Sequence, residues 1–208
     1  MIVALVFAHV WGVIQMIALG SFARTVRVRT VLMALAVGLY VCAPLAVVLQ
    51  MGWIRPATWL TGVSLWAMKD TASYTANPFI EEILKVLPVA TLLLFPALRR
   101  QWSLTDCVLT GAAAGSGFGL SESLFRYGAA AHKANVTDQG WVLTSNISFP
   151  VVPGIWNTIN SWLPAAGAPW DQISVAGRFP PDPHLVWSAL GGLAAGLIMS
   201  CDPERTCG

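Results

Sequence analysis

Five apolar stretches, each close to the length of a membrane-spanning helix, constrain this chain more than any other feature. They run from Ile2 to Phe22, Val31 to Met51, Pro78 to Leu98, Leu104 to Leu124 and Pro183 to Ser200. A helix that crosses a bilayer needs about 20 predominantly apolar residues. Only 11% of the 208 residues are charged, against about 25% in an average soluble domain. The sequence therefore predicts an all-α integral membrane protein, a polytopic bundle of about five spans.

Two further segments are apolar but do not have the form of a regular span. Thr58 to Met68 is short, and Trp141 to Trp162 is interrupted by two prolines and a glycine. Either segment could be a helix that lies in the interface or re-enters the membrane. Because no internal repeat divides the chain, we expect residues 1–208 to form a single membrane domain.

The distribution of arginine predicts the orientation of the chain. Three arginines lie within residues 24–29, after the first span, and two lie at residues 99–100, after the third. Cytoplasmic loops carry an excess of Lys and Arg, so both loops should be cytoplasmic. With five spans, the N-terminus and a cap of residues 127–182 would be extracytoplasmic and the C-terminus cytoplasmic. We expect the host membrane to be a bacterial plasma membrane.

Ionisable residues cluster where the third predicted span begins. Asn77-Pro78 is followed by Glu81, Glu82 and Lys85. Asn77 is expected to cap the helix, and Lys85, one turn after Glu81, to neutralise or orient that carboxylate. An ionisable residue inside a span costs about 2.5–3.5 kcal/mol and is a functional candidate by default. This helix should therefore face protein or water rather than lipid.

The fourth and fifth spans supply the other candidates. Glu122 lies on a face of small residues that a neighbouring helix can approach closely, and Arg126, one turn later, could pair with it. His184 follows an Asp-Pro pair that should start the last helix, and it shares a face with Ser188. At 1.5 Å per residue, Glu81, Glu122 and His184 lie roughly 24–27 Å from the cytoplasmic boundary. Three spans should thus present them at one level.

These motifs resemble those of the PrsW family of intramembrane proteases, which is related to the type II CAAX-processing endopeptidases. In chain order they are Glu81-Glu82-x-x-Lys85, Gly115-x-Gly117-Phe118-x-x-x-Glu122-x-x-x-x-Tyr127 and His184-x-x-Trp187-Ser188. The resemblance covers residues 77–198. It implies an intramembrane endopeptidase that hydrolyses a peptide bond of a single-span membrane protein or membrane peptide, near the extracytoplasmic face of the bilayer.

The resemblance also implies roles for individual residues. Glu81 or Glu82 would hold the attacking water and act as its general base, and Glu122 would help to position that water or the second carboxylate. His184 would donate to the developing oxyanion or protonate the leaving amine. Four residues would support this group, namely Asn77, Lys85, Arg126 and Ser188.

We expect no cofactor, because one histidine is fewer than the two or three of typical catalytic zinc sites. Two or three glutamates and a histidine could nevertheless bind a divalent ion. A metal-dependent enzyme would use Glu82, Glu122 and His184 as ligands. His9, inside the first span, is interpreted as a packing histidine, although its depth would also suit a catalytic role.

Two other functions fit the same residues. The chain could be a non-catalytic relative that binds a membrane peptide, or a small transporter that uses the buried carboxylates. A carrier should show pseudo-symmetric halves with paired broken helices, which are not evident in the sequence. No HExxH motif or nucleophile elbow occurs, which disfavours HExxH-type zinc, serine and cysteine peptidases. No basic stripe interleaved with aromatic residues occurs either, which argues against a nucleic-acid partner.

Overall fold

The computed structural model describes residues 1–138, 140–143, 150–160, 168–169 and 182–200. The helices are α1 (Ile2–Leu19), α2 (Val28–Val37), α3 (Ala43–Thr61), α4 (Leu65–Tyr74), α5 (Ala76–Leu93), α6 (Pro96–Gln101), α7 (Leu104–Tyr127), α8 (Ile155–Ile159) and α9 (Pro183–Ser200), with a π-helical turn η1 (Gly38–Cys42) and a 3₁₀ turn η2 (Ala131–Lys133). The prediction of a mostly helical protein is thus confirmed. The predicted cytoplasmic tail after residue 200 lies outside the described residues.

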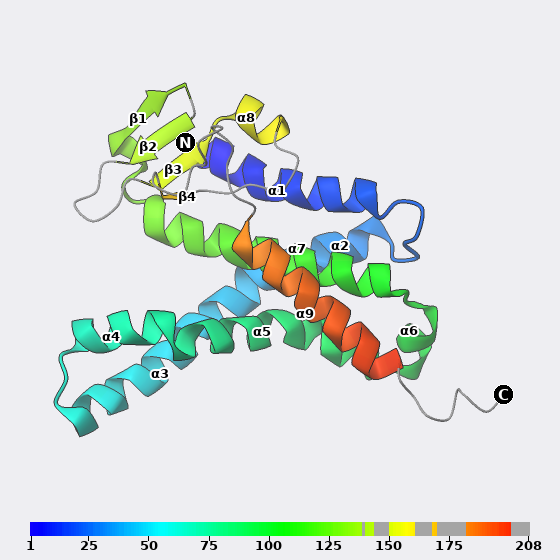
Figure 1. The fold of residues 1–208 in the computed structure, drawn as a ribbon, viewed down its shortest axis with the longest axis horizontal. Helices are drawn as coiled ribbons and strands as arrows, with labels where there is room; N and C mark the ends of the chain where they lie inside the picture. Colours follow the sequence, from blue (N-terminus) through cyan, green and yellow to red (C-terminus); the bar gives the residue numbers. More distant parts are fainter. Residues whose placement is uncertain (139, 144–149, 161–167, 170–181, 201–208) are drawn as a thin grey trace.

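Helix α7 lies at the centre of the bundle, with α1, α2, α5 and α9 packed around it (Figure 1). Almost every residue from Asp106 to Ser121 is buried. Small residues make this possible, because a Cβ at Gly115 would collide with the carbonyl oxygen of His184 and one at Gly117 with that of Leu35. Backbones that touch in this way leave little freedom to slide. The small-residue face of α7 therefore fixes where the start of α9 lies.

Helices occupy all five segments predicted to span the membrane, but five spans are not confirmed. Among the described residues, two helices are long and apolar enough to cross a bilayer, α1 and the continuous helix Val28–Thr61 formed by α2, η1 and α3. The second has 34 residues and a length of about 51 Å, which exceeds the hydrocarbon thickness of about 30 Å. The predicted span 31–51 is thus the middle of a longer helix.

The ambiguous segment 58–68 is the turn of a helical hairpin rather than a separate span. Helix α3 ends where Gly62 adopts a φ of 69°, and α4 begins after Ser64, whose hydroxyl oxygen accepts from the third backbone N–H of the turn. A positive φ suits glycine because it has no Cβ. The hairpin then leads directly into α5.

Helix α5 begins earlier than predicted. It starts at Ala76, with Thr75 as the residue before the first turn, so Asn77 lies inside the helix and the predicted N-cap is wrong. The reason is local, because α4 ends at Tyr74 and one residue, Thr75, with φ −115° and ψ −87°, makes the break between the two helices. Asn77 faces the cleft described below.

A small antiparallel sheet corrects the all-α prediction. Its strands, in order, are β1 (Ala134–Thr137), β2 (Gly140–Leu143), β3 (Pro150–Pro153) and β4 (Ala168–Pro169). The segment 141–162, predicted as an interfacial or re-entrant helix, instead contains β2, β3 and the short α8 where it is described. Trp141 pairs with Val152, which packs on Leu5 of α1. β-branched and aromatic residues flanked by prolines favour strands over a helix. Much of the rest of the predicted cap 127–182 lies outside the described residues.

Candidate functional site

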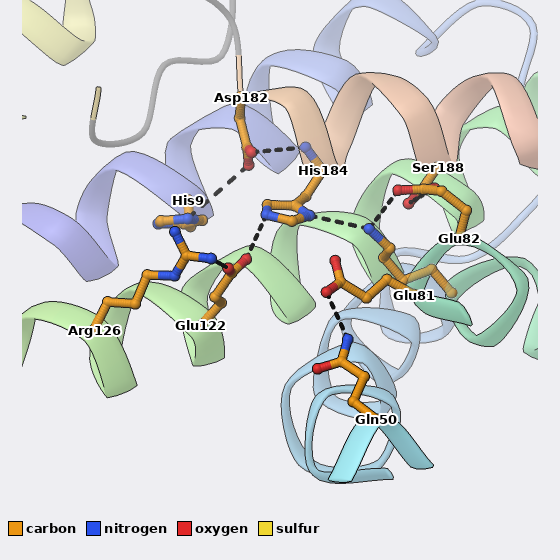
Figure 2. A network of polar contacts seen from close by, with 10 residues as sticks. His9, Gln50, Glu81, Glu82, Glu122, Arg126, Asp182, His184 and Ser188 are labelled. Carbon is orange, nitrogen blue, oxygen red and sulfur yellow. Dashed lines mark hydrogen bonds and ion pairs between the residues drawn. The ribbon is translucent and has the colours of Figure 1, made fainter. Parts of the chain in front are cut away.

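The ionisable residues of three helices line one cleft of about 950 Å³. Helix α5 supplies Glu81 and Glu82, α7 supplies Glu122, and α9 supplies His184 (Figure 2). Asn77 and Arg126 also line the cleft, whereas Lys85 and Ser188 are fully buried beside it. The structure thus brings together the residues that the sequence placed at one level of the bundle.

His184 links α9 to both other helices. Its Nε2 lies 2.6 Å from Glu122 Oε2, and its Nδ1 lies 3.0 Å from the Nζ of Lys85. An ammonium group can only donate, so Nδ1 accepts from Lys85, and the ring proton on Nε2 is donated to Glu122. The backbone N–H of His184 donates to Asp182 Oδ1 at 3.0 Å, which confirms the predicted Asp-Pro start of α9. His184 is therefore held at both ring nitrogens and at its backbone N–H.

Lys85 is completely buried and pairs with Glu82 rather than with Glu81. Its Nζ donates to Glu82 Oε1 at 2.5 Å and lies 4.6 Å from the ring centroid of Phe118. A cation in that position is attracted by the face of the ring. Among the described residues, the second oxygen of Glu82 has one long contact, of 3.4 Å, from the hydroxyl of Ser188. Glu82 lines the cleft and thus keeps one oxygen weakly bonded.

Glu81 is held from a different helix. Gln50 of α3 donates through Nε2 to Glu81 Oε1 at 2.8 Å. We did not identify Gln50 from the sequence, because it lies outside the three motifs. The only signal that could have revealed it is a lone amide in an otherwise apolar run. This bond holds Glu81 toward α3, while Lys85 pairs with Glu82.

Glu81, Glu122 and His184 form a group that could hold a metal ion. Each offers one ligand atom, and the three atoms lie within 4.8 Å of one another. The group contains Glu81, whereas the ligand set named from the sequence contained Glu82. Glu122 also forms an ion pair with Arg126, whose side chain is 64% exposed. Together with Asp182, the three glutamates give the cleft an excess of negative charge that favours a cation.

A family model described as "PrsW family intramembrane metalloprotease" matches residues 26–148 of the chain. The match covers more than half of the sequence, and it includes both glutamates of α5 and Glu122. It ends before α9, so His184 is placed at the site by the structure and not by the match. No curated protein and no solved structure matches the chain.

The expectation that the protein needs no metal is wrong. The matching family is one of metalloproteases, and the structure holds a fitting donor set in Glu81, Glu122 and His184. The number of histidines alone does not decide whether a metal binds, because catalytic zinc sites have three protein ligands in total and leave a fourth position open. Two carboxylates and one imidazole supply those three ligands, and the carboxylates offset the positive charge of a divalent ion.

Proposed function

The chain belongs to the PrsW family of intramembrane metalloproteases, and from this premise we propose that it hydrolyses a peptide bond of a single-span membrane protein or membrane peptide in the cleft. One observation supports the proposal. Glu81, Glu122 and His184 each offer one ligand atom, and these three atoms lie within 4.8 Å of one another. Family membership also favours a protease over the peptide-binding relative and the transporter that the sequence left open.

Glu81, Glu122 and His184 would hold the metal ion, since carboxylate and imidazole ligands suit zinc. When bound, such an ion polarises a carbonyl group and lowers the pKa of water. Gln50 orients Glu81 through the hydrogen bond described above. Partners of this kind usually matter for both affinity and activity.

Glu82 is the residue that we assign to proton transfer. Its side chain is 35% exposed in the cleft, and Lys85 balances its charge through the other oxygen. As the water oxygen bonds to the scissile carbonyl carbon, Glu82 takes a proton from that water. It returns this proton to the nitrogen when the C–N bond breaks, so the products are a carboxylic acid and an amine.

We place the cleft near the extracytoplasmic face. Glu122 lies about 24 Å along α7 from Asp106, and Asp106 binds the loop between α1 and α2 through the backbone N–H groups of Thr25 and Val26. This loop and α6 carry the arginines and lie at the end of the bundle away from the sheet (Figure 1). Basic loops are cytoplasmic as a rule, so the opposite end, with the N-terminus, faces outward.

The test uses the full-length protein, purified in detergent, with single-span membrane proteins as candidate substrates. We expect about one divalent ion per chain, cleavage that a chelator abolishes, and recovery when zinc is added. Glu122→Gln and His184→Ala should lose both the bound metal and cleavage. His132→Gln, at an exposed histidine that does not line the cleft, should keep both. Cleavage that survives both substitutions and the chelator would refute the assigned site.

A further inference from the structure

A second pair of buried polar groups joins α1 to the start of α9. Nδ1 of His9 lies 2.9 Å from the carbonyl oxygen of Leu5. A carbonyl oxygen can only accept, so Nδ1 carries a proton, and in its neutral form the ring presents a lone pair at Nε2. That Nε2 lies 4.0 Å from Asp182 Oδ2, which is too far for a direct hydrogen bond. Two acceptors thus face one another.

Both groups are almost completely buried, with His9 2% and Asp182 3% exposed. Within the part of the chain that the structure describes, neither His9 Nε2 nor Asp182 Oδ2 has a hydrogen-bond partner. An unsatisfied buried acceptor is unfavourable by itself, and a pair of them is more so. The pair therefore suits an occupant that brings several N–H or O–H donors or a positive charge.

The pair belongs to the same cleft as the proposed metal ligands. His9 and Asp182 both line it, and Figure 2 shows Asp182 between His9 and His184. Asp182 uses its other oxygen, Oδ1, to accept from the backbone N–H of His184. Whatever binds His9 and Asp182 is therefore next to the group that would cleave the peptide bond.

We propose that His9 Nε2 and Asp182 Oδ2 form a subsite for the amine side of the cleaved bond. This inference rests on the proposed function, because peptide hydrolysis leaves a new amino terminus in the cleft. An ammonium group has three N–H donors, so it can bond to both acceptors at once, and Asp182 balances its charge. A metal ion at the same place would need three or four ligands, whereas this pair supplies two.

The other carboxylates of the cleft are less suited to this task. Glu82 is paired with Lys85 and Glu122 with Arg126, and Glu81 accepts from Gln50. Asp182 has no lysine or arginine partner among the described residues, and its Oδ2 lies 4.0 Å from His9 Nε2. The amine therefore meets its best acceptors between α1 and the start of α9.

Asp182→Asn is the most informative variant. The asparagine keeps a side-chain oxygen that can cap α9, so the helix should still form. Its NH₂ group replaces Oδ2 and can donate to His9 Nε2, which satisfies that acceptor within the protein. The variant thus removes the negative acceptor without leaving a buried group unpaired. His9→Phe is the second variant, and His132→Gln, at an exposed histidine, is the matched control.

The probes are phenylalanine amide, which has a free amino group, and N-acetylphenylalanine amide, which does not. Their binding to the full-length protein in detergent is measured by calorimetry. We expect the wild type and His132→Gln to bind the free amine at least about tenfold more tightly, as suits hydrogen bonds to a charged group. In Asp182→Asn and His9→Phe this preference should fall below about twofold.

Equal binding of the two probes by the wild type, or an unchanged preference in Asp182→Asn, would overturn the subsite. So would zinc binding at two sites in the wild type and at one in His9→Phe, because the pair would then hold a metal. Binding of the probes is measured without cleavage, so the experiment tests the amine subsite separately from the proposed protease function. Amine binding without any proteolysis refutes the proposed function alone, and metal-dependent proteolysis without the amine preference refutes the subsite alone.

Discussion

Helix α7 carries two acidic residues whose surroundings differ completely. Asp106, in its first turn, is fully buried and accepts from the backbone N–H groups of Thr25, Val26 and Ser103 at 2.7–2.8 Å. Glu122, near the other end, has a side chain that is 22% exposed and contacts His184 and Arg126. One carboxylate accepts from backbone N–H groups, and the other contacts two side chains.

The difference shows what separates a structural acid from a functional one in the same helix. A carboxylate that accepts several backbone N–H bonds has no oxygen left for a ligand and gives up much free energy if it loses them. A carboxylate whose partners are mobile or titratable side chains can exchange them for a metal ion. Burial alone does not identify the functional residue, because Asp106 is the more buried of the two.

The largest expected effect is that of Glu122→Gln on activity. The amide keeps the size of the side chain but is a poor metal ligand, so proteolysis should fall on the order of a thousandfold and bound metal should be lost. The unfolding midpoint in detergent should hardly change, since Glu122 contributes little to packing. Metal analysis and cleavage of one substrate measure the first two quantities. If activity stays high while stability drops, Glu122 resembles Asp106 after all.

Asp106→Asn should show the opposite pattern. Its NH₂ group would face backbone donors on one side, so we expect the free energy of unfolding to fall by about 3 kcal/mol. Metal content per folded protein should stay at the wild-type value, because the site is at the far end of α7. Denaturant titration followed by tryptophan fluorescence gives the first value, and metal analysis of the folded fraction gives the second. Loss of metal from folded protein would contradict the separation of the two ends.

The sequence predicted the convergence of the three motifs because the fixed rise per residue of a helix converts a number of residues into a depth in the membrane. Residues 18 positions into one span and 16 from the end of another come to the same level when both are straight helices. The Asp-Pro start of α9 was also predictable, since both residues have strong positional preferences. The small residues of α7 predicted which face of this helix a neighbour would cover, but they did not predict which helix the neighbour would be.

Partners from distant segments could not be predicted in the same way. Gln50 bonds to Glu81 because the continuous helix Val28–Thr61 crosses α5 at that point, and no spacing in the chain encodes a crossing. Lys85 can reach either glutamate by its spacing. The contacts around its pairing with Glu82 come from distant segments, with Gln50 of α3 on Glu81 and with His184 of α9 on Lys85. The sheet was missed because its strands are too short for alternation to stand out from a general apolar run.

Gln50→Leu tests whether such a partner tunes the site. Without the donor, Glu81 can turn toward Lys85, and metal affinity should fall about 10- to 100-fold, as for other residues that hold a ligand in place. The measurement is competition for zinc with a chelator of known affinity. Val48→Ala, at an exposed position on the same helix, is the control. An unchanged affinity would mean that Glu81 needs no orientation, or that it is not a ligand.

The smallest expected effect belongs to Arg126→Gln, and it decides how to interpret Glu122. If Glu122 serves mainly as the partner of Arg126, this change should cost as much activity as Glu122→Gln. If Glu122 is a metal ligand, the loss should be about two- to fivefold and should shrink at high salt, because Arg126 is 64% exposed and exposed ion pairs contribute little. Cleavage rates at low and high ionic strength distinguish the cases. A thousandfold loss would make Glu122 an ion-pair residue, and the contrast between the ends of α7 would then be one of exposure rather than of function.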